Sequence, residues 1–349
     1  MTLDSIQAQD PSDMLGHIRA FPDHLSVGWQ RGADAAGYGW QATDFNAVVV
    51  CGMGGSAIGG DLLRTFAEPQ APVPVHVVRG YALPGFVTDR TLVVISSYSG
   101  GTEETLSCYA DARERGATVL AVTSGGEVKT TAEEAGHKVI EIPGGMQPRA
   151  ALGFSLGVLL RLAREIGLAE VSDNTFDEAL DLARARSERL GSPEGENEAT
   201  ALAETLYGKL SVIYSGPGLL EAVNMRWRTQ LHENAKAPAV GNLFPELNHN
   251  EIMGFEAAPE AVAGEMAVVV LRDEGDHPQV QKRMAVTRDL VADGVASWTV
   301  VDSEGPSRLA RMLSLLQLGD FASFYLAMLQ QVDPTPVETI QELKRTLAS

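Results

Sequence analysis

The sequence of 349 residues is poor in cysteine, which excludes a fold that depends on a disulfide framework. Its two cysteines, Cys51 and Cys108, show no metal-ligand spacing with the seven scattered histidines. His232-Glu233 is not followed by the second histidine of a zinc-protease helix. We therefore expect Cys51 to be a small buried side chain, and we expect no metal and no cofactor.

Basic residues are also scarce. Lysine and arginine number 27 against 46 aspartates and glutamates, which gives a formal net charge of −19. Nucleic-acid binding needs a basic surface, so a nucleic-acid partner is not expected. The acidic surplus mainly favours solubility, and an anionic ligand would have to be met by a local positive field.

Long hydrophobic runs are missing as well. No apolar stretch of the sequence reaches the length of a membrane span, and the first residues, MTLDSIQAQD, lack the basic and apolar regions of a signal peptide. We expect a cytoplasmic protein without a membrane partner. Hydrophobic residues at 44% and charged residues at 21% are typical of a globular protein, and the length allows two domains.

Two glycine loops each follow an apolar run, in NAVVVCGMGGSAIGGDLL (46–63) and TLVVISSYSGGTEETL (91–106). Each pattern predicts a buried strand, a tight turn and the N-terminus of a helix, whose unpaired N–H groups attract anions. The residues expected to surround a phosphate are Gly54, Gly55, Ser56, Ser97, Ser99 and Thr102. Neither loop has the lysine of a nucleotide-binding P-loop, so the predicted ligand is a small phosphorylated metabolite rather than ATP.

Strands and helices are predicted to alternate between residues 46 and 143, as in a parallel sheet with helices on both faces. The expected strands are 46–51, 74–78, 91–96, 118–122 and 138–142, and the expected helices are 56–67, 102–115 and 128–135. Residues 1–44 look helical and peripheral, and 150–190 form long amphipathic helices. The polar segment GSPEGENEAT (191–200) is predicted to be a linker or a loop at a domain boundary. The expected division is an N-terminal extension (1–44), a first domain (45–190) and a second domain (200–349).

The second half of the sequence repeats the first in outline. LSVIYSGPGLLEAVNMRW (210–227) again predicts a strand, a glycine turn and a helix, and residues 265–305 parallel residues 91–126. This indicates an internal duplication. RDEGDH stands in the second copy where the first has SSYSGGT, and acidic side chains would repel a phosphate. We therefore expect only the first domain to bind phosphate.

Three further polar residues are candidates for chemistry. Glu233 ends a predicted helix, and His249 lies in a polar run before an apolar step. A carboxylate and an imidazole that face one cleft are suited to proton transfer, although solvated surface residues are the alternative. Arg149, in GGMQPRA (144–150), follows the last predicted strand of the first domain, where open parallel sheets bind ligands. It is placed to reach an anion, or else it pairs with an acidic neighbour.

Six motifs resemble, in order, those of the bifunctional phosphoglucose/phosphomannose isomerases of the sugar isomerase (SIS) superfamily. They are GMGGSAIGGDLL, HVVRGYALP, SYSGGTEETL, PRAALG, HENAKAPA and ELNHNEIMGF, and the resemblance runs from about residue 45 to the C-terminus. It implies an α/β fold of two flavodoxin-like SIS domains and a dimer. It also implies that glucose 6-phosphate, and mannose 6-phosphate, are interconverted with fructose 6-phosphate through a cis-enediolate.

The resemblance also implies roles for single residues. The hydroxyls of the two glycine loops would hold the 6-phosphate, and Arg149 would stabilise the enediolate. Glu233 would move the proton between C1 and C2. His249, supplied by the partner subunit, would open the sugar ring, and Lys344, in the final helix, would assist at the ring oxygen.

The sequence departs from the resemblance in two places. Gly101 stands where many members of the family have asparagine, so one side-chain donor is missing. The polar insert at 191–200 and the long N-terminus are expected to alter the dimer surface. Thr335, in DPTPVE, is a small residue that we expect to leave room for both epimeric sugars.

Other functions remain open from the sequence. Gly52-x-Gly54 after a strand, with Arg79 for a 2′-phosphate, is compatible with an NADP-linked dehydrogenase, although that interpretation gives the second hydroxyl loop no role. A non-catalytic sugar-phosphate-binding SIS protein is a further alternative, which the joint presence of Glu233, His249 and Arg149 disfavours. Another SIS-type sugar-phosphate isomerase also fits.

Overall fold

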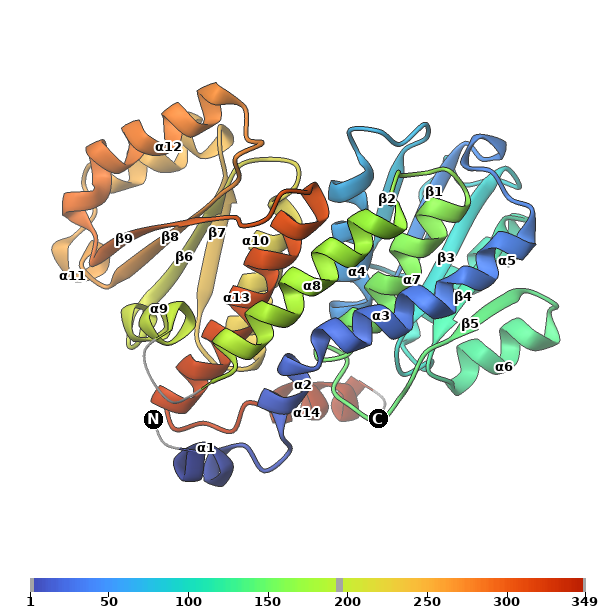
Figure 1. Cartoon of the computed structure of the whole chain (residues 1–349), viewed down its shortest axis with the longest axis horizontal. Helices are drawn as coiled ribbons and strands as arrows, with labels where there is room; N and C mark the ends of the chain where they lie inside the picture. Colours follow the sequence, from blue (N-terminus) through green and yellow to red (C-terminus); the bar gives the residue numbers. More distant parts are fainter. Residues whose placement is uncertain (1–2, 193–196, 348–349) are drawn as a thin grey trace. The chain divides into compact units, whose positions relative to one another are not determined.

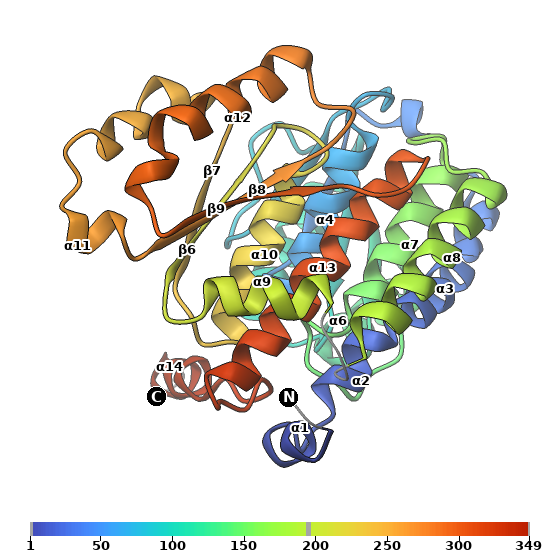
Figure 2. The same ribbon diagram turned by 60° about the vertical axis from the view of Figure 1, so that its left-hand side comes forward.

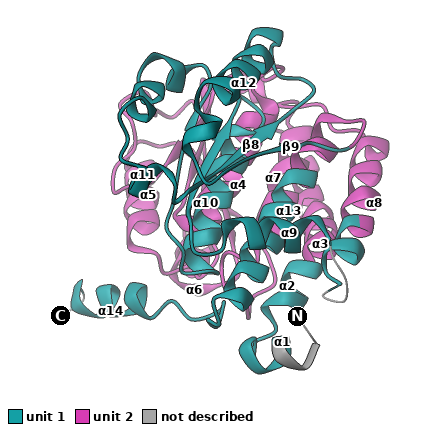
Figure 3. Ribbon diagram, turned by 90° about the vertical axis from the view of Figure 1, so that its left-hand side faces the viewer, with its two compact units in different colours: residues 1–19, 186–304, 314–349 teal, residues 20–185, 305–313 magenta. Residues whose placement is uncertain are grey.

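Parallel strands alternate with helices along most of the chain in the computed structural model, which describes residues 3–192 and 197–347 (Figure 1). The chain divides into two units (Figure 3). The N-sheet unit comprises residues 20–185 and 305–313, and the C-sheet unit comprises residues 1–19, 186–304 and 314–349.

The N-sheet unit is built on a parallel sheet with the strand order β2-β1-β3-β4-β5. Its strands are β1 (Ala47–Cys51), β2 (Val75–Val78), β3 (Thr91–Ser97), β4 (Thr118–Thr123) and β5 (Lys138–Glu141). β1 and β3 are buried along their whole length, because helices cover both faces of the sheet. The five predicted strands are therefore confirmed, with ends that differ by at most one residue.

Helices cover the two faces of this sheet as the strand order requires (Figure 1). α5 (Glu103–Glu114) and α6 (Gly126–Glu134) share one buried apolar cluster with the sheet, which includes Cys108, Val128 and side chains of β1 and β3. α4 (Gly54–Ala67) and α7 (Leu152–Glu165) cover the opposite face, where Gly60 lies against Val50. α8 (Asp173–Leu190) follows α7.

The N-terminal segment is helical, as expected, but part of it is not peripheral. It forms α1 (Leu3–Gln9), α2 (Met14–Arg19), α3 (Phe21–Gly32), η1 (Ala33–Tyr38) and η2 (Ala42–Asp44). α3 is packed tightly on α7, because a Cβ atom on Gly157 would lie 2.3 Å from the carbonyl oxygen of Leu25. The ring of Trp29 also stacks on Phe176, with 4.0 Å between centroids. Glycine in α7 thus allows α3 to become part of the core.

The C-sheet unit repeats the same topology, with the strand order β7-β6-β8-β9 corresponding to β2-β1-β3-β4. Its strands are β6 (Leu210–Ser215), β7 (Ala239–Leu243), β8 (Met266–Arg272) and β9 (Ser297–Asp302). The predicted internal duplication is confirmed. β7 was not among the predicted strands, since its sequence, AVGNL, is short, contains Gly241 and Asn242, and is only partly buried at the sheet edge.

Helices of this unit lie on both faces of its sheet (Figure 2). Besides α1 and α2, the unit contains α9 (Glu198–Leu206), α10 (Glu221–Glu233), η3 (Glu246–His249), η4 (Glu251–Phe255), α11 (Glu260–Ala263), α12 (Pro278–Val291), η5 (Ala292–Gly294), the greater part of α13 (Arg308–Leu329) and α14 (Glu338–Leu347). α10 is fixed to α13 by a buried pair in which Arg226 donates to Asp320 at 2.9 Å. Trp227 lies on Gly319, where a Cβ atom would be 2.3 Å from its ring nitrogen.

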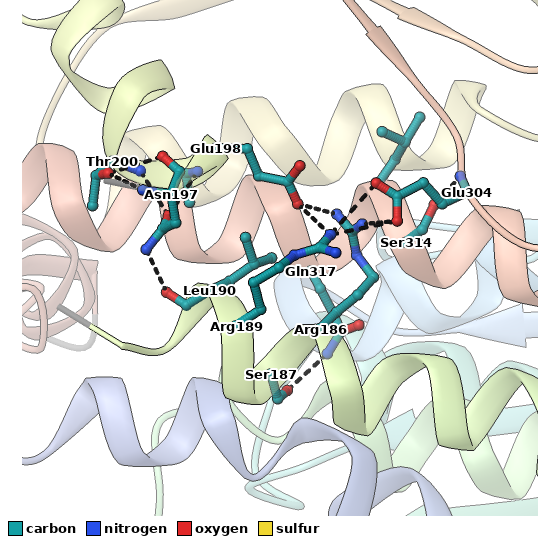
Figure 4. A network of polar contacts seen from close by, with 12 residues as sticks. Arg186, Ser187, Arg189, Leu190, Asn197, Glu198, Thr200, Glu304, Ser314 and Gln317 are labelled. Carbon is teal, nitrogen blue, oxygen red and sulfur yellow. Dashed lines mark hydrogen bonds and ion pairs between the residues drawn. The ribbon is translucent and has the colours of Figure 1, made fainter. Parts of the chain in front are cut away.

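The predicted linker at 191–200 is shorter in the structure, and residues 193–196 lie outside the described part of the chain. Asn197 caps α9, so residues 198–200 already belong to that helix. Figure 4 shows how the two ends of the segment are held. Arg186, only 2% exposed, pairs with Glu198 at 3.1 Å and with Glu304 at 2.6 Å.

α13 corrects the expectation that no stretch is long and apolar enough to cross a membrane. Its 22 residues reach a mean hydropathy of 1.4 over the most apolar window. However, 94% of that window is buried inside the protein, as in a core helix.

Candidate active site

The two glycine loops meet at the carboxyl ends of β1 and β3, in the middle of the N-sheet. The strand order reverses between these two strands, and the helices that follow them, α4 and α5, cover opposite faces. Sheets of this order bind ligands in the crevice that such a reversal opens. All six residues predicted to surround a phosphate lie there, namely Gly54, Gly55, Ser56, Ser97, Ser99 and Thr102.

Hydrogen bonds hold the loop hydroxyls in place. The backbone N–H of Tyr98 donates to Ser56 Oγ at 3.1 Å, which ties one loop to the other. Because a hydroxyl accepts through its lone pairs and still carries one proton, Ser56 can donate to a further acceptor. Ser97 Oγ lies 3.4 Å and Ser99 Oγ 3.5 Å from Thr102 Oγ1, so the hydroxyls of the second loop converge at the start of α5.

Two helix N-termini face this group of hydroxyls. Within the described chain, neither Met53, before α4, nor Thr102, before α5, caps its helix through a side-chain hydrogen bond. Backbone N–H groups of the first turns therefore lack side-chain partners, and the positive ends of both helix dipoles lie at the crevice. Gly54 has a φ of +50°, a conformation that glycine adopts without strain.

Arg149 belongs to the same site. A Cβ atom on Gly55 would lie 2.6 Å from the carbonyl oxygen of Pro148, so the glycine loop touches the backbone beside Arg149. The Tyr98 hydroxyl accepts a hydrogen bond from the N–H of Met146 at 3.2 Å, which anchors this segment to the second loop. Arg149 is only 2% exposed. The backbone that carries Arg149 thus lies beside the two helix N-termini, whose dipoles give this acidic protein a local positive field.

The equivalent point of the C-sheet is occupied by acidic side chains. A Cβ atom on Gly216 would lie 2.4 Å from the Asp276 carboxylate, and Asp276 also accepts a hydrogen bond from the Asp273 N–H at 2.9 Å. The N-terminus of α12 is capped by His277, which accepts from the Gln279 N–H at 3.1 Å. In the second copy, the Asp276 carboxylate thus lies at the point that corresponds to the glycine loops of the first copy.

Glu233 is the last residue of α10, as the sequence predicts, and it lines a cavity of about 750 Å³ in the C-sheet unit. The cavity wall opposite it comes from the segment between α13 and α14, including Asp333, Pro336 and Val337. A half-buried carboxylate at a cavity of this size is suited to act on a small molecule.

Glu233 and His249 lie at opposite ends of the strands of the C-sheet within one chain. Near the start of α10, Asn224 donates to Asn242 O, at the far end of β7, at 3.2 Å. Near the end of α10, His232 Nε2 lies 3.0 Å from the carbonyl oxygen of Ala239, where β7 begins. α10 therefore runs antiparallel to β7, so Glu233 precedes this strand and His249 follows it. The length of β7, about 15 Å at roughly 3.3 Å per residue, separates the two ends.

The loop that carries His249 is anchored by a residue that the sequence did not single out. Glu251 Oε1 accepts a hydrogen bond from the Tyr214 hydroxyl at 2.5 Å, and Oε2 accepts one from Asn242 at 2.6 Å. Burial raises the pKa of Tyr214 above its usual range, and the bond to Glu251 raises it further. His249 itself is exposed in η3. Only the fold reveals this anchor, because Tyr214 lies 37 residues from Glu251 in the sequence.

Lys344 lies on α14 and is exposed. It follows Ile340, which lines the Glu233 cavity, by four residues, so the two share one face of the helix.

The structure also describes the residues behind three smaller expectations. Arg79, the candidate for a nucleotide 2′-phosphate, forms an ion pair with Asp61. Cys51 and Cys108 are buried free thiols. Among the described residues, no three histidine, cysteine, aspartate or glutamate side chains gather in a way that could hold a metal ion.

Comparisons with known proteins agree with these features. A family model described as the bacterial phospho-glucose isomerase C-terminal SIS domain matches residues 195–347. A bifunctional phosphoglucose/phosphomannose isomerase of Caldicellulosiruptor bescii is 44% identical over 337 residues, covering 96% of this chain and 99% of the relative. A protein of the same name from Aquifex aeolicus is 38% identical over 306 residues, covering 87% and 91%.

Among solved structures, a hypothetical protein from Thermus thermophilus superposes with a TM-score of 0.73 at 18% identity, covering 98% of this chain and 92% of that one. This similarity concerns the fold, and the two sequence relatives extend it to the family. The chain belongs to the family of bifunctional phosphoglucose/phosphomannose isomerases.

Proposed function

We propose that the protein is an aldose–ketose isomerase that interconverts glucose 6-phosphate and mannose 6-phosphate with fructose 6-phosphate through a cis-enediolate. The observation that supports it most is the crevice of the N-sheet, where Arg149, two helix N-termini and four hydroxyls gather without a P-loop lysine. Such a crevice suits the phosphate of a small metabolite. The relatives named above carry the corresponding activities in their names.

The residues divide the chemistry between them. Glu233 removes the proton from C2 and returns it to C1, while Arg149 stabilises the charge that develops on the substrate oxygens. The phosphate is remote from the reacting carbons, so its binding positions them rather than activating them. In the proposed division of the chain, residues 45–190 bind the phosphate and residues 200–349 supply the base and the C-terminal helix with Lys344.

A second copy of the chain supplies His249 in this proposal. The supporting observation is that Glu233 and His249 lie at opposite ends of the strands of the same sheet. Residues so placed cannot act together within one unit. In a two-fold symmetric dimer, each chain lends the same surface to the other. His249 would then open the ring over the partner's site.

We propose that the protein acts in the cytoplasm, where the reaction belongs to glycolysis and gluconeogenesis.

The proposed reaction needs no metal. With the purified protein, fructose 6-phosphate should form from both aldose phosphates, and chelation should not abolish the activity. Activity that is lost on chelation and restored by zinc would contradict the proposal, and substrate binding without turnover would favour the non-catalytic alternative.

Glu233→Gln isolates the proton-transfer step. Glutamine keeps the shape of the side chain but cannot take a proton, and positioned bases typically contribute about 10² to 10⁴ in rate. The variant should bind substrate, lose at least about 10² in kcat, and stop exchanging the C2 hydrogen of glucose 6-phosphate with solvent. Exchange at the wild-type rate would show that another group is the base.

A further inference from the structure

We propose that Lys236 is a positioning residue, which fixes Glu233 and the facing wall of its cavity through two backbone carbonyls. This inference rests on the function proposed above. Lys236 Nζ donates to the carbonyl oxygen of Glu233 at 2.6 Å and to that of Pro334 at 3.1 Å. One ammonium group thus joins the residue that we assign as the base to the segment on the other side of the cavity.

The carbonyl of Glu233 is a favourable acceptor for this ammonium. Glu233 is the last residue of α10, and the last carbonyls of a helix lack partners within the helix. They also carry the negative end of the helix dipole, which a lysine stabilises. Lys236 therefore restrains the backbone of the terminal turn at the residue whose side chain lines the cavity.

The backbone of Lys236 ends the α10 region in a left-handed conformation, closed by the Ala237 N–H, which donates to the carbonyl oxygen of Leu231 at 3.1 Å. The φ of Lys236 is +54°, in the left-handed region that residues with a Cβ atom rarely adopt. Glycine or asparagine would adopt this conformation at lower cost. The position therefore has a lysine where the local backbone favours another residue, and the two hydrogen bonds of the side chain compensate for the strain.

The facing wall has little regular structure of its own to hold it. It is the segment between α13 and α14, from residue 330 to residue 337, in which Thr335 N donates to Asp333 Oδ1 at 2.8 Å. Gln330 Nε2 also donates to the carbonyl oxygen of Ala235 at 2.5 Å. The bond from Lys236 to Pro334 is a further link between the loop after α10 and this segment, and Lys236 itself lines the cavity.

Loss of the two bonds should affect turnover more than substrate binding. The phosphate crevice belongs to the other unit and does not include Lys236, so the Michaelis constant should change little. Proton transfer depends on the position of the Glu233 carboxylate, and a displacement of about 1 Å can cost about 10² in rate. α14, which carries Lys344, begins only four residues after Pro334.

Lys236→Gly is the central variant of the test, because glycine keeps the positive φ and removes the ammonium. Lys236→Met removes the ammonium but keeps the stem and the strain, and Lys236→Arg keeps donors at this position. Lys282→Met, an exposed lysine of α12, is the matched control. Steady-state kinetics with glucose 6-phosphate and amide hydrogen exchange over residues 332–340, without substrate, are measured for each protein.

For Lys236→Gly and Lys236→Met we expect a loss of about 10- to 100-fold in kcat, a Michaelis constant within about threefold of wild type, and faster exchange over 332–340. Lys236→Arg should recover part of kcat, and Lys282→Met should match wild type. Wild-type kcat in Lys236→Gly would overturn the inference, whether or not exchange changes. Unchanged exchange would show that the tether does not hold the segment. An inactive wild-type protein would instead refute the proposed function, and exchange would then decide on the tether alone.

Discussion

At the scale of single residues, the positions of the residues in the proposed phosphate crevice could be predicted largely from sequence, whereas the contacts around Glu233 and His249 could not. Hydroxyls and glycines after apolar runs are local patterns, and local geometry places them at helix N-termini. Lys236 and Glu251 act through partners that are distant in the sequence, Pro334 and Tyr214. No periodicity or spacing brings such pairs together, so they emerge only from the fold.

The hydroxyls of the second loop give a direct test at this scale. Ser97→Ala and Ser99→Ala should mainly raise the Michaelis constant, since each hydroxyl is expected to contribute a charge-assisted hydrogen bond of about 1.5–3 kcal/mol to a phosphate. Steady-state kinetics measure the effect. Ser107→Ala is the control, because the Ser107 hydroxyl in α5 donates to the carbonyl oxygen of Tyr81 outside the crevice. An unchanged Michaelis constant in the double variant would place the phosphate elsewhere.

At the scale of elements, strands buried on both faces were the easiest to predict. β1 and β3 are continuous apolar runs bounded by glycine or hydroxyl turns, as parallel strands under helices must be. β7 was missed because an edge strand needs no such run. The close packing of α3 on α7 was also missed, since the sequence does not show that glycines of α7 face the backbone of α3.

The anchor of the His249 loop gives a prediction at this scale. Tyr214→Phe keeps the buried ring on β6 and removes one of the two donors to Glu251. The variant should fold, and it should lose more activity on closed-ring sugar phosphates than on open-chain analogues, because in the proposed mechanism His249 opens the ring. Tyr109→Phe, which removes a hydroxyl from the N-sheet unit, is the control. Equal losses on both kinds of substrate would contradict the assigned role of the loop.

At the scale of the whole molecule, topology carries the argument for a site shared between chains. The sequence indicated the duplication and the loss of the anion site from its second copy. It did not show that α10 places Glu233 at the end of the strands opposite to His249, because that depends on the parallel pairing of β7 with β6. One chain has both residues, but its own sheet separates them.

Co-expression of two differently tagged inactive variants, Glu233→Gln and His249→Ala, tests this account most directly. If His249 acts on the partner's substrate, each mixed dimer has one site with an intact Glu233 and an intact His249. Random pairing in a two-fold dimer should then restore about one quarter of the wild-type activity, and the isolated mixed dimer should show about half. No recovery in a mixed dimer that both tags confirm would contradict the account, because it would mean that each chain completes its own site.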